Sequence, residues 1–267
     1  MENTRRRFLG TSAALGTGAL LASGTASAAK ASKDAKENLM FEVPKTTIPV
    51  VGSKQQFQVR RIYCIGRNYA AHAREMGSDP DREPPFFFEK PTDAIQLVPA
   101  GKIIDHPYPP MTKNYHYEVE LVAAIGKRGR DIDVKDALSY VVAYAVGLDM
   151  TRRDLQNNMK EQRKPWEVGK SFDRSAVIGH LQPLASTGHF SKGAITLSVN
   201  GQVKQSSDLS QMIWSVAEQI ANLSKYYELF PGDLIYSGTP ENVGPVVPGD
   251  VMVGHIDGLN DISVKVI

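Results

Sequence analysis

The sequence predicts a strand-dominated α+β domain with few helices. Many short runs rich in β-branched and aromatic residues end at turn signals, such as Asn-Gly at 200–201 and Pro-Gly-Asp at 231–233 and 248–250. Only residues 209–227 repeat apolar residues with the spacing of a long amphipathic helix. The G-x-G-x-x-G and Walker patterns of nucleotide-binding domains are absent from the sequence. Together these observations predict a domain of many short strands joined by tight turns and brief helices.

The elements of the first half follow from local patterns. Residues 59–65 form an apolar run typical of a strand, and Asn68 is placed to cap a short helix that begins at Tyr69. Residues 79–85 are polar and rich in proline, which predicts a mobile loop. Residues 86–91 and 115–123 predict two more strands, and residues 134–140 predict a brief helix.

The second half continues in the same way. Residues 141–148 are a continuous apolar run that predicts a buried strand, and residues 151–160 predict a polar helix. Residues 195–200 alternate as a strand and turn at Asn-Gly into a second strand, which indicates a hairpin. After the amphipathic helix, residues 234–240 predict a strand that runs into a turn. Residues 251–256 and 262–267 predict a closing hairpin.

Length and composition limit the classes of protein. A chain of 267 residues allows one large domain or two small ones, and no clear break follows Val59. We therefore expect a linker and extended segment at 29–58 and one domain at 59–267. The net charge of +2 gives no argument for a nucleic acid partner, and we expect none. The single Cys64 cannot form an internal disulfide and is predicted to be a buried packing residue.

The N-terminus has the pattern of an export signal. Arg5, Arg6, Phe8 and Leu9 resemble a twin-arginine motif, and Ala26-Ser27-Ala28 has the small-x-small pattern of a cleavage site. We expect residues 1–28 to be removed and the mature protein to be periplasmic. The apolar run between these motifs is too short to span a bilayer comfortably, so no stable membrane anchor is expected. A basic, disordered tail remains the alternative.

Three carboxylates are candidates for a metal site. Side chains alternate along a strand, so Glu118 and Glu120 point the same way, and Asp149 ends the next predicted strand. Like charges on an apolar strand repel one another unless a cation binds between them. Carboxylates without nearby cysteine or an H-E-x-x-H pattern indicate Mg²⁺ or Mn²⁺ rather than zinc. The alternative is that both glutamates lie on the solvated face of an edge strand.

Other motifs suggest acid–base chemistry. His72 and Glu75 are three residues apart on the predicted helix, so the carboxylate can orient the imidazole as a general base. The alternative is an ordinary surface pair. Arg153 and Gln156 have the same spacing on the polar helix, and Lys170 lies in a turn between glycine and serine.

In this order the motifs resemble the fumarylacetoacetate hydrolase family, closest to its acylpyruvase and fumarylpyruvate hydrolase branch. The similarity covers roughly residues 59–267. The matching segments are Gly66-Arg67-Asn68-Tyr69 with His72 and Glu75, Glu118-x-Glu120, Leu148-Asp149-Met150-Thr151 with Arg153, Asp154 and Gln156, Lys170-Ser171-Phe172, and Ser237-Gly238-Thr239-Pro240 with Gly244-Pro245. The export signal departs from most relatives, which are intracellular.

The resemblance implies a fold of mixed sheets rolled into a β-sandwich or barrel, and a homodimer. It also implies a site for Mg²⁺ or Mn²⁺, with a general-base pair on a segment that orders over the substrate. The implied metal ligands are Glu118, Glu120 and Asp149, the catalytic residues His72, Glu75 and Lys170, and the substrate-binding residues Arg67, Lys90, Arg153, Gln156 and Thr239.

The implied activity is metal-dependent hydrolysis of the C3–C4 bond of 2,4-dioxo acids, acylpyruvates such as fumarylpyruvate or acetylpyruvate. The products are pyruvate and a carboxylic acid. Three carboxylates around a divalent cation leave a charge of −1, so an anionic substrate needs nearby cations. Arg67, Lys90 and Lys170 are the expected cations. Two alternatives stay open: decarboxylation of oxaloacetate or tautomerisation of a keto acid at the same site, and an exported keto-acid binder without turnover.

Overall fold

The computed structural model describes residues 39–77 and 83–267. The predicted export signal at 1–28, the linker to residue 38 and most of the predicted loop at 79–85 lie outside the described residues. Residues 44–267 form one compact unit, so this unit begins ahead of the predicted domain start at residue 59. Residues 39–43 belong to a separate unit, in which Met40 and Phe41 are exposed.

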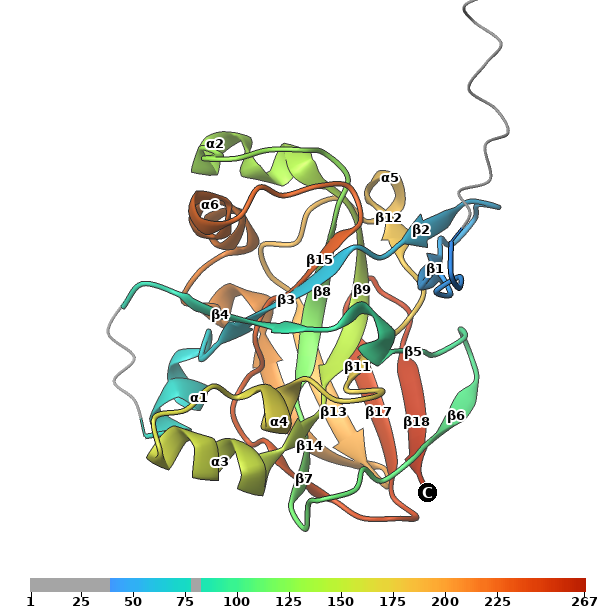
Figure 1. Cartoon of the computed structure of the whole chain (residues 1–267), viewed down its shortest axis with the longest axis vertical. Coiled ribbons are helices and arrows are strands. Elements are labelled where there is room, and N and C mark those ends of the chain that lie inside the picture. The colour runs from blue at the N-terminus through green and yellow to red at the C-terminus, as the bar shows by residue number, and fades with distance from the viewer. Residues whose placement is uncertain (1–38, 78–82) are drawn as a thin grey trace, which may run out of the picture. The chain divides into compact units, whose positions relative to one another are not determined.

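The largest sheet is mixed and curled (Figure 1). Its path is β4 (Phe86–Lys90), β3 (Arg61–Gly66), β15 (Asp233–Tyr236), β8 (Val119–Ile125), β9 (Val141–Asp149), β11 (Ala176–Ile178) and β5 (Ile95–Leu97), and β12 (Gln182–Pro183) also pairs with β9. The pairs β3–β15 and β5–β11 are parallel and the other pairs are antiparallel.

A second, five-stranded sheet packs against the first. It runs in the order β14 (Gln202–Asp208), β13 (Ala194–Val199), β17 (Val251–Ile256), β18 (Ile262–Val266) and β6 (Ile103–His106). Two small sheets complete the strands. One is β10 (Thr151–Arg152), β7 (Tyr115–Tyr117) and β16 (Gly244–Val246), and the other is β1 (Thr47–Pro49) with β2 (Gln56–Gln58).

Short helices connect the strands. The α-helices are α1 (Ala70–Glu75), α2 (Val134–Ala137), α3 (Arg153–Glu161), α4 (Glu167–Lys170), α5 (Leu184–Thr187) and α6 (Val216–Tyr226), and the 3₁₀ turns are η1 (Thr92–Ala94), η2 (Leu138–Tyr140) and η3 (Leu209–Gln211). In Figure 1, α2 lies beside α6 at one end of the sheets. No helix of the described residues is long and apolar enough to cross a membrane. The predicted strand-dominated α+β class is confirmed.

Strand β8 divides the core into two clusters because its side chains alternate. Val119, Leu121 and Ala123 are fully buried in the larger cluster, between the two large sheets and α6. Val122 and Ala124 face the smaller cluster on the opposite side. This smaller cluster contains Cys64, which is fully buried and free, as predicted. The site described below lies on the same face of β8 as this smaller cluster.

Two local predictions are wrong. Asn68 does not cap α1, which has Tyr69 as its N-cap and no side-chain cap hydrogen bond. The amphipathic helix predicted over 209–227 begins only at Val216, after the separate turn η3. Ser215 and Glu218 form a reciprocal capping box at this point, which satisfies the first N–H groups and fixes the start of the helix.

Candidate active site

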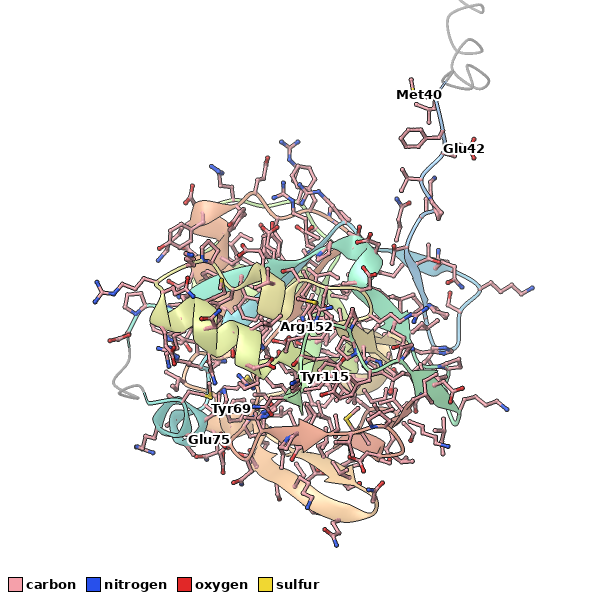
Figure 2. The ribbon with its side chains drawn as sticks, turned by 60° about the horizontal axis from the view of Figure 1, so that its bottom comes forward. Met40, Glu42, Tyr69, Glu75, Tyr115 and Arg152 are labelled. Carbon is pink, nitrogen blue, oxygen red and sulfur yellow. The ribbon has the colours of Figure 1, made fainter. Side chains whose placement is uncertain are left out.

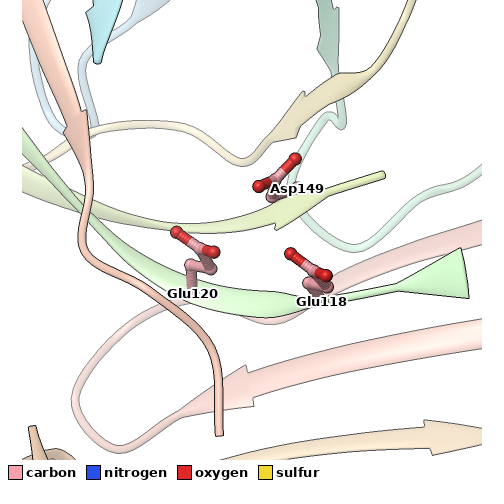
Figure 3. Close-up of side chains that lie close together, drawn as sticks. All are labelled: Glu118, Glu120 and Asp149. Carbon is pink, nitrogen blue, oxygen red and sulfur yellow. The ribbon is translucent and has the colours of Figure 1, made fainter. Parts of the chain in front are cut away.

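Three carboxylates meet where β8 and β9 run side by side (Figure 3). The backbone N–H of Asp149 donates to the carbonyl of Glu118 at 2.9 Å, so these two residues lie opposite one another. Glu118 lies in the short break between β7 and β8, and Glu120 lies two positions further on the same face. One oxygen from each side chain lies within 4.8 Å of the others, and all three residues are at most 4% exposed.

Lys170, at the C-terminal end of α4, forms ion pairs with two of these carboxylates. Its Nζ lies 2.7 Å from Glu118 Oε2, 2.7 Å from Asp149 Oδ2 and 2.7 Å from Thr151 Oγ1. Burial alone would lower the pKa of Lys170, but the charges of Asp149 and Glu118 outweigh it and raise the pKa. The ammonium group therefore stays charged, with all three of its N–H groups directed at protein oxygens.

Lys90 also pairs with Asp149, from the end of β4. Its Nζ lies 2.8 Å from Asp149 Oδ1 and donates to the carbonyl oxygens of Met150 and Lys170. Lys90 is 2% exposed and is not among the residues that line the pocket. Lys90 therefore holds Asp149 and the end of α4 in this structure, and its contact with a substrate stays a prediction.

Arg153 is the third basic partner and comes from the first turn of α3. Its Nη2 donates to Glu118 Oε1, and its Nη1 donates to Gln156 Oε1 at 2.6 Å. Arg67, which was expected to balance the charge, makes no ion pair within the described residues. Its guanidinium instead lies over the rings of Phe86 and Trp166, 5.5 and 6.0 Å from their centroids.

These contacts separate Glu120 from the other two carboxylates. Burial would raise the pKa of Glu118, but Lys170 and Arg153 outweigh it and hold this pKa below its usual range. Among the described residues, Glu120 accepts a hydrogen bond only from the backbone N–H of Gly238, at 2.9 Å. Burial and the charges of Asp149 and Glu118 raise the pKa of Glu120 well above its usual range. A carboxylate that has no basic partner among the described residues, beside two that form ion pairs, is a donor set that a hard divalent cation fits.

The charge of the site agrees with the expectation, but Arg153 takes the place that was expected for Arg67. When all three carboxylates are ionised, the three basic groups of Lys90, Lys170 and Arg153 balance their charge. A divalent cation would then give it an excess of two positive charges. Such an excess attracts an anionic substrate without any contribution from Arg67.

The predicted His72–Glu75 pair is present on α1. His72 Nδ1 lies 3.1 Å from Glu75 Oε2, which also accepts the backbone N–H of Asn242 at 3.1 Å. Figure 2 shows Glu75 at the C-terminal end of this helix and Tyr69 at its start. His72 is 5% exposed and lines the same pocket as the carboxylates, whereas Glu75 does not line it. The imidazole therefore faces the pocket, and Glu75 fixes its orientation from behind.

One pocket collects most of the predicted site residues from five separate segments. It is lined by Ile65, Gly66, Arg67, His72, Met76, Phe88, Glu118, Glu120, Asp149, Arg153, Gln156, Trp166, Lys170 and Thr239. The lining combines aromatic and apolar side chains with charged ones. Such a pocket suits a small anion with an apolar or unsaturated tail.

The sequence motifs missed the role of Asn68, which fastens α1 to two distant segments. Its Nδ2 donates to the carbonyl oxygens of Trp214 and Ser237 at 2.9 and 2.8 Å, and its Oδ1 accepts the N–H of Trp214 at 2.8 Å. The side chain is fully buried. Ser237 precedes Gly238, so Asn68 connects the start of the histidine helix to the turn that binds Glu120. An asparagine just before a short helix was a visible signal, but it suggested a local cap.

Comparison with known proteins agrees with this geometry. A model of the fumarylacetoacetate (FAA) hydrolase C-terminal domain matches residues 61–267. The chain belongs to the fumarylacetoacetate hydrolase family. Within this family, a fumarylpyruvate hydrolase from Ralstonia sp is 47% identical over 193 residues, which cover 72% of this chain and 98% of the relative. The mitochondrial oxaloacetate tautomerase of Homo sapiens is 40% identical, covering 78% of this chain and 91% of the relative.

Solved structures give the same result. The crystal structure of fumarylpyruvate hydrolase from Pseudomonas aeruginosa in complex with Mn²⁺ and pyruvate is 57% identical. The two structures superpose with a TM-score of 0.85, and the superposition covers 86% of this chain and 99% of the Pseudomonas aeruginosa chain. The predicted resemblance to the fumarylacetoacetate hydrolase family and to its fold is therefore confirmed.

Proposed function

We propose that this protein is a metal-dependent hydrolase of acylpyruvates, which cleaves a 2,4-dioxo acid to pyruvate and a carboxylic acid. The observation that carries the proposal is that the oriented His72 lines the same pocket as the three carboxylates. A hydrolase needs a base for water as well as a site that stabilises an enolate. The fumarylpyruvate hydrolases from Ralstonia sp and Pseudomonas aeruginosa support this choice.

The residues divide the work as follows. Nδ1 of His72 is held by Glu75, and Nε2 has no hydrogen-bond partner among the described residues, so Nε2 can take a proton from water. Glu118, Glu120 and Asp149 would hold Mg²⁺ or Mn²⁺, which supplies Lewis-acid stabilisation of the developing negative charge. Lys170 can donate to a substrate oxygen once a cation shares the charge of Glu118 and Asp149. Arg67, Arg153, Gln156 and Thr239 line the pocket as candidate substrate contacts.

A second candidate activity uses the same site without a hydrolytic water. Relatives include an oxaloacetate decarboxylase of Dictyostelium discoideum, 43% identical, and the oxaloacetate tautomerase of Homo sapiens. Both reactions pass through an enol or enolate of a keto acid, so the carboxylates and Lys170 suffice for them. The third candidate is an exported binder of keto acids without turnover, which would not need the His72–Glu75 pair.

Turnover of acetylpyruvate and oxaloacetate distinguishes these activities. We expect the Mn²⁺-loaded protein to consume the diketo absorbance of acetylpyruvate and to release pyruvate. The His72→Ala variant should lose hydrolysis by at least about a hundredfold, the range of general-base catalysis, and keep its affinity for Mn²⁺. His255→Ala is the matched control, because His255 on β17 is only half-buried, pairs with Asp257 and Asp261 and does not line the pocket, so the rate should be unchanged. Hydrolysis at the wild-type rate in His72→Ala would reject the assignment of the base.

We also propose export by the twin-arginine route and a homodimeric assembly. Export of a folded chain would allow Mg²⁺ or Mn²⁺ to bind in the cytoplasm, before copper or zinc compete outside. Replacement of Arg5, Arg6 and Arg7 by lysine should keep the protein uncleaved in the cytoplasm, as cell fractionation with N-terminal sequencing will show. An uncleaved wild-type protein found only in the cytoplasm would reject export.

Light scattering of the mature protein tests the homodimer. A measured mass equal to that of a monomer would reject it.

A further inference from the structure

Gln205 is a buried amide in a strand that is otherwise largely exposed. The first three residues of β14 are exposed, as is the residue after Gln205, whereas Gln205 has no exposed surface. A polar side chain that loses water entirely must find its hydrogen bonds within the protein. Its partners therefore indicate why this position carries a glutamine.

The partners fix the orientation of this amide without ambiguity. Oε1 accepts the backbone N–H of Val119 at 3.1 Å. Nε2 donates to Thr239 Oγ1 at 2.9 Å and to the carbonyl oxygen of Pro240 at 2.8 Å. A backbone N–H can only donate and a carbonyl can only accept, so the two ends of the amide cannot be exchanged.

At Val119, the Gln205 amide accepts the hydrogen bond that a neighbouring strand would otherwise accept. Strand β15 pairs with β8 only as far as Tyr236, opposite Val122, and the chain then turns away. The N–H of Val119 is left without a strand partner on that side, between the ligand candidates Glu118 and Glu120. Gln205 satisfies this N–H from the second sheet and so fixes the backbone that carries both carboxylates.

The Gln205 amide also determines whether the Thr239 hydroxyl donates or accepts its other hydrogen bond. Because the Gln205 amide nitrogen can only donate, Thr239 Oγ1 accepts from it, and the hydroxyl hydrogen must point elsewhere. None of the described residues accepts that hydrogen, and Thr239 lines the pocket. The hydroxyl is therefore a donor available to a ligand oxygen, which suits an anion.

We propose that Gln205 is a positioning residue that holds the Thr239 hydroxyl as a hydrogen-bond donor to the carboxylate of a 2-oxo acid. This inference rests on the proposed function for the class of substrate. In its effect on anion affinity of the Mn²⁺-loaded protein, Gln205 acts through Thr239, so the losses caused by changing the two residues should not add.

A double-mutant cycle on pyruvate binding tests the coupling. We expect Thr239→Val and Gln205→Met each to weaken pyruvate binding to the Mn²⁺-loaded protein by roughly tenfold, as for one hydrogen bond to a charged group. The double variant should bind no more weakly than Thr239→Val alone, as measured by titration calorimetry. Gln202→Met, an exposed change on the same strand, is the control and should bind like wild type.

Gln205→Glu separates the polarity of the amide from its packing. It keeps the size of the side chain and the acceptor for Val119, but its ionised carboxylate would take the Thr239 hydroxyl hydrogen. We expect pyruvate binding to weaken at least as much as in Gln205→Met, and this variant serves if Gln205→Met does not fold. Additive losses in the double variant, near a hundredfold, would overturn the inference, as would wild-type binding in Gln205→Glu.

The wild-type protein provides an independent measurement. In a crystal structure with Mn²⁺ and pyruvate, Thr239 Oγ1 should lie within hydrogen-bond distance of a pyruvate carboxylate oxygen. A separation well beyond 3.5 Å, the geometric limit for such a bond, rejects the inference. If the protein hydrolyses no acylpyruvate but its pyruvate binding shows the coupling, the proposed function is rejected. This inference then still stands.

Discussion

Among single residues, Glu120 is distinguished by having no basic partner within the described residues. Its neighbours Glu118 and Asp149 are each paired with lysine or arginine. In the metal-free protein, the charge of Glu120 is therefore a cost in like-charge repulsion and desolvation. Its function is then in binding a cation and not in stabilising the fold.

The variant Glu120→Gln separates these two effects. The amide keeps an oxygen for the N–H of Gly238 but removes the like charge. We expect the melting temperature of the metal-free protein to stay level or rise, and the Mn²⁺ affinity to fall by at least about a hundredfold, more than for an outer-shell partner. Thermal melts with and without Mn²⁺ measure both. A fall in the metal-free melting temperature would contradict this account of Glu120.

At the scale of secondary-structure elements, α1 is too short to be stable alone and depends on Asn68. We expect Asn68→Ala to lower the free energy of unfolding by roughly 2–3 kcal/mol, because it removes the three hydrogen bonds that this fully buried side chain makes to Trp214 and Ser237. It should also lower the rate of hydrolysis, since α1 carries His72. Urea denaturation and turnover measure the two effects. Asn158→Ala, on the exposed face of α3, is the control and should change neither.

How far the sequence predicts an element depends on where its partners lie. Glu118, Glu120 and Asp149 could be placed because strand alternation is local and β8 and β9 are consecutive long strands. Asn68 could not, because its partners lie near residues 214 and 237, and its local pattern suggested a helix cap. Lys90 was predicted to contact the substrate from a count of charges in the sequence. Such a count does not show which cation lies buried behind a carboxylate.

At the scale of the whole unit, His106 joins three sheets. It lies in β6 of the five-stranded sheet and contacts Gln96 of the large sheet and Tyr115 of a small sheet, which Figure 2 labels beside Arg152 of the paired strand β10. The Nδ1–H donates to Gln96, whose own amide donates to a backbone carbonyl, and Nε2 accepts from Tyr115. This network fits only the neutral imidazole. Burial, with a smaller contribution from Arg174, lowers the pKa of His106 to about 4.

The sign of the pH effect follows from this lowered pKa. The unfolded chain takes up the proton first as the pH falls through 6.5, so stability from this group is complete above that pH. It is lost towards pH 4, by about 3 kcal/mol in total. We expect His106→Gln to remove this part of the acid destabilisation in urea melts between pH 7 and 4. His255→Gln should not remove it, because pairing with Asp261 raises the pKa of His255. An unchanged pH slope in His106→Gln would refute the assignment.

The placement of the three carboxylates on neighbouring strands also has a consequence for the order of folding. One loop closure, between residues 118 and 149, brings two of them together, whereas the N–H of Gly238 reaches Glu120 across 118 positions of the chain. Contacts close in sequence form at a smaller entropic cost and earlier than distant ones. In refolding followed by pulsed hydrogen exchange, the amides of β8 and β9 should gain protection before Gly238 does. The acidic half of the pocket would then exist, for a time, without the half that recognises an anion.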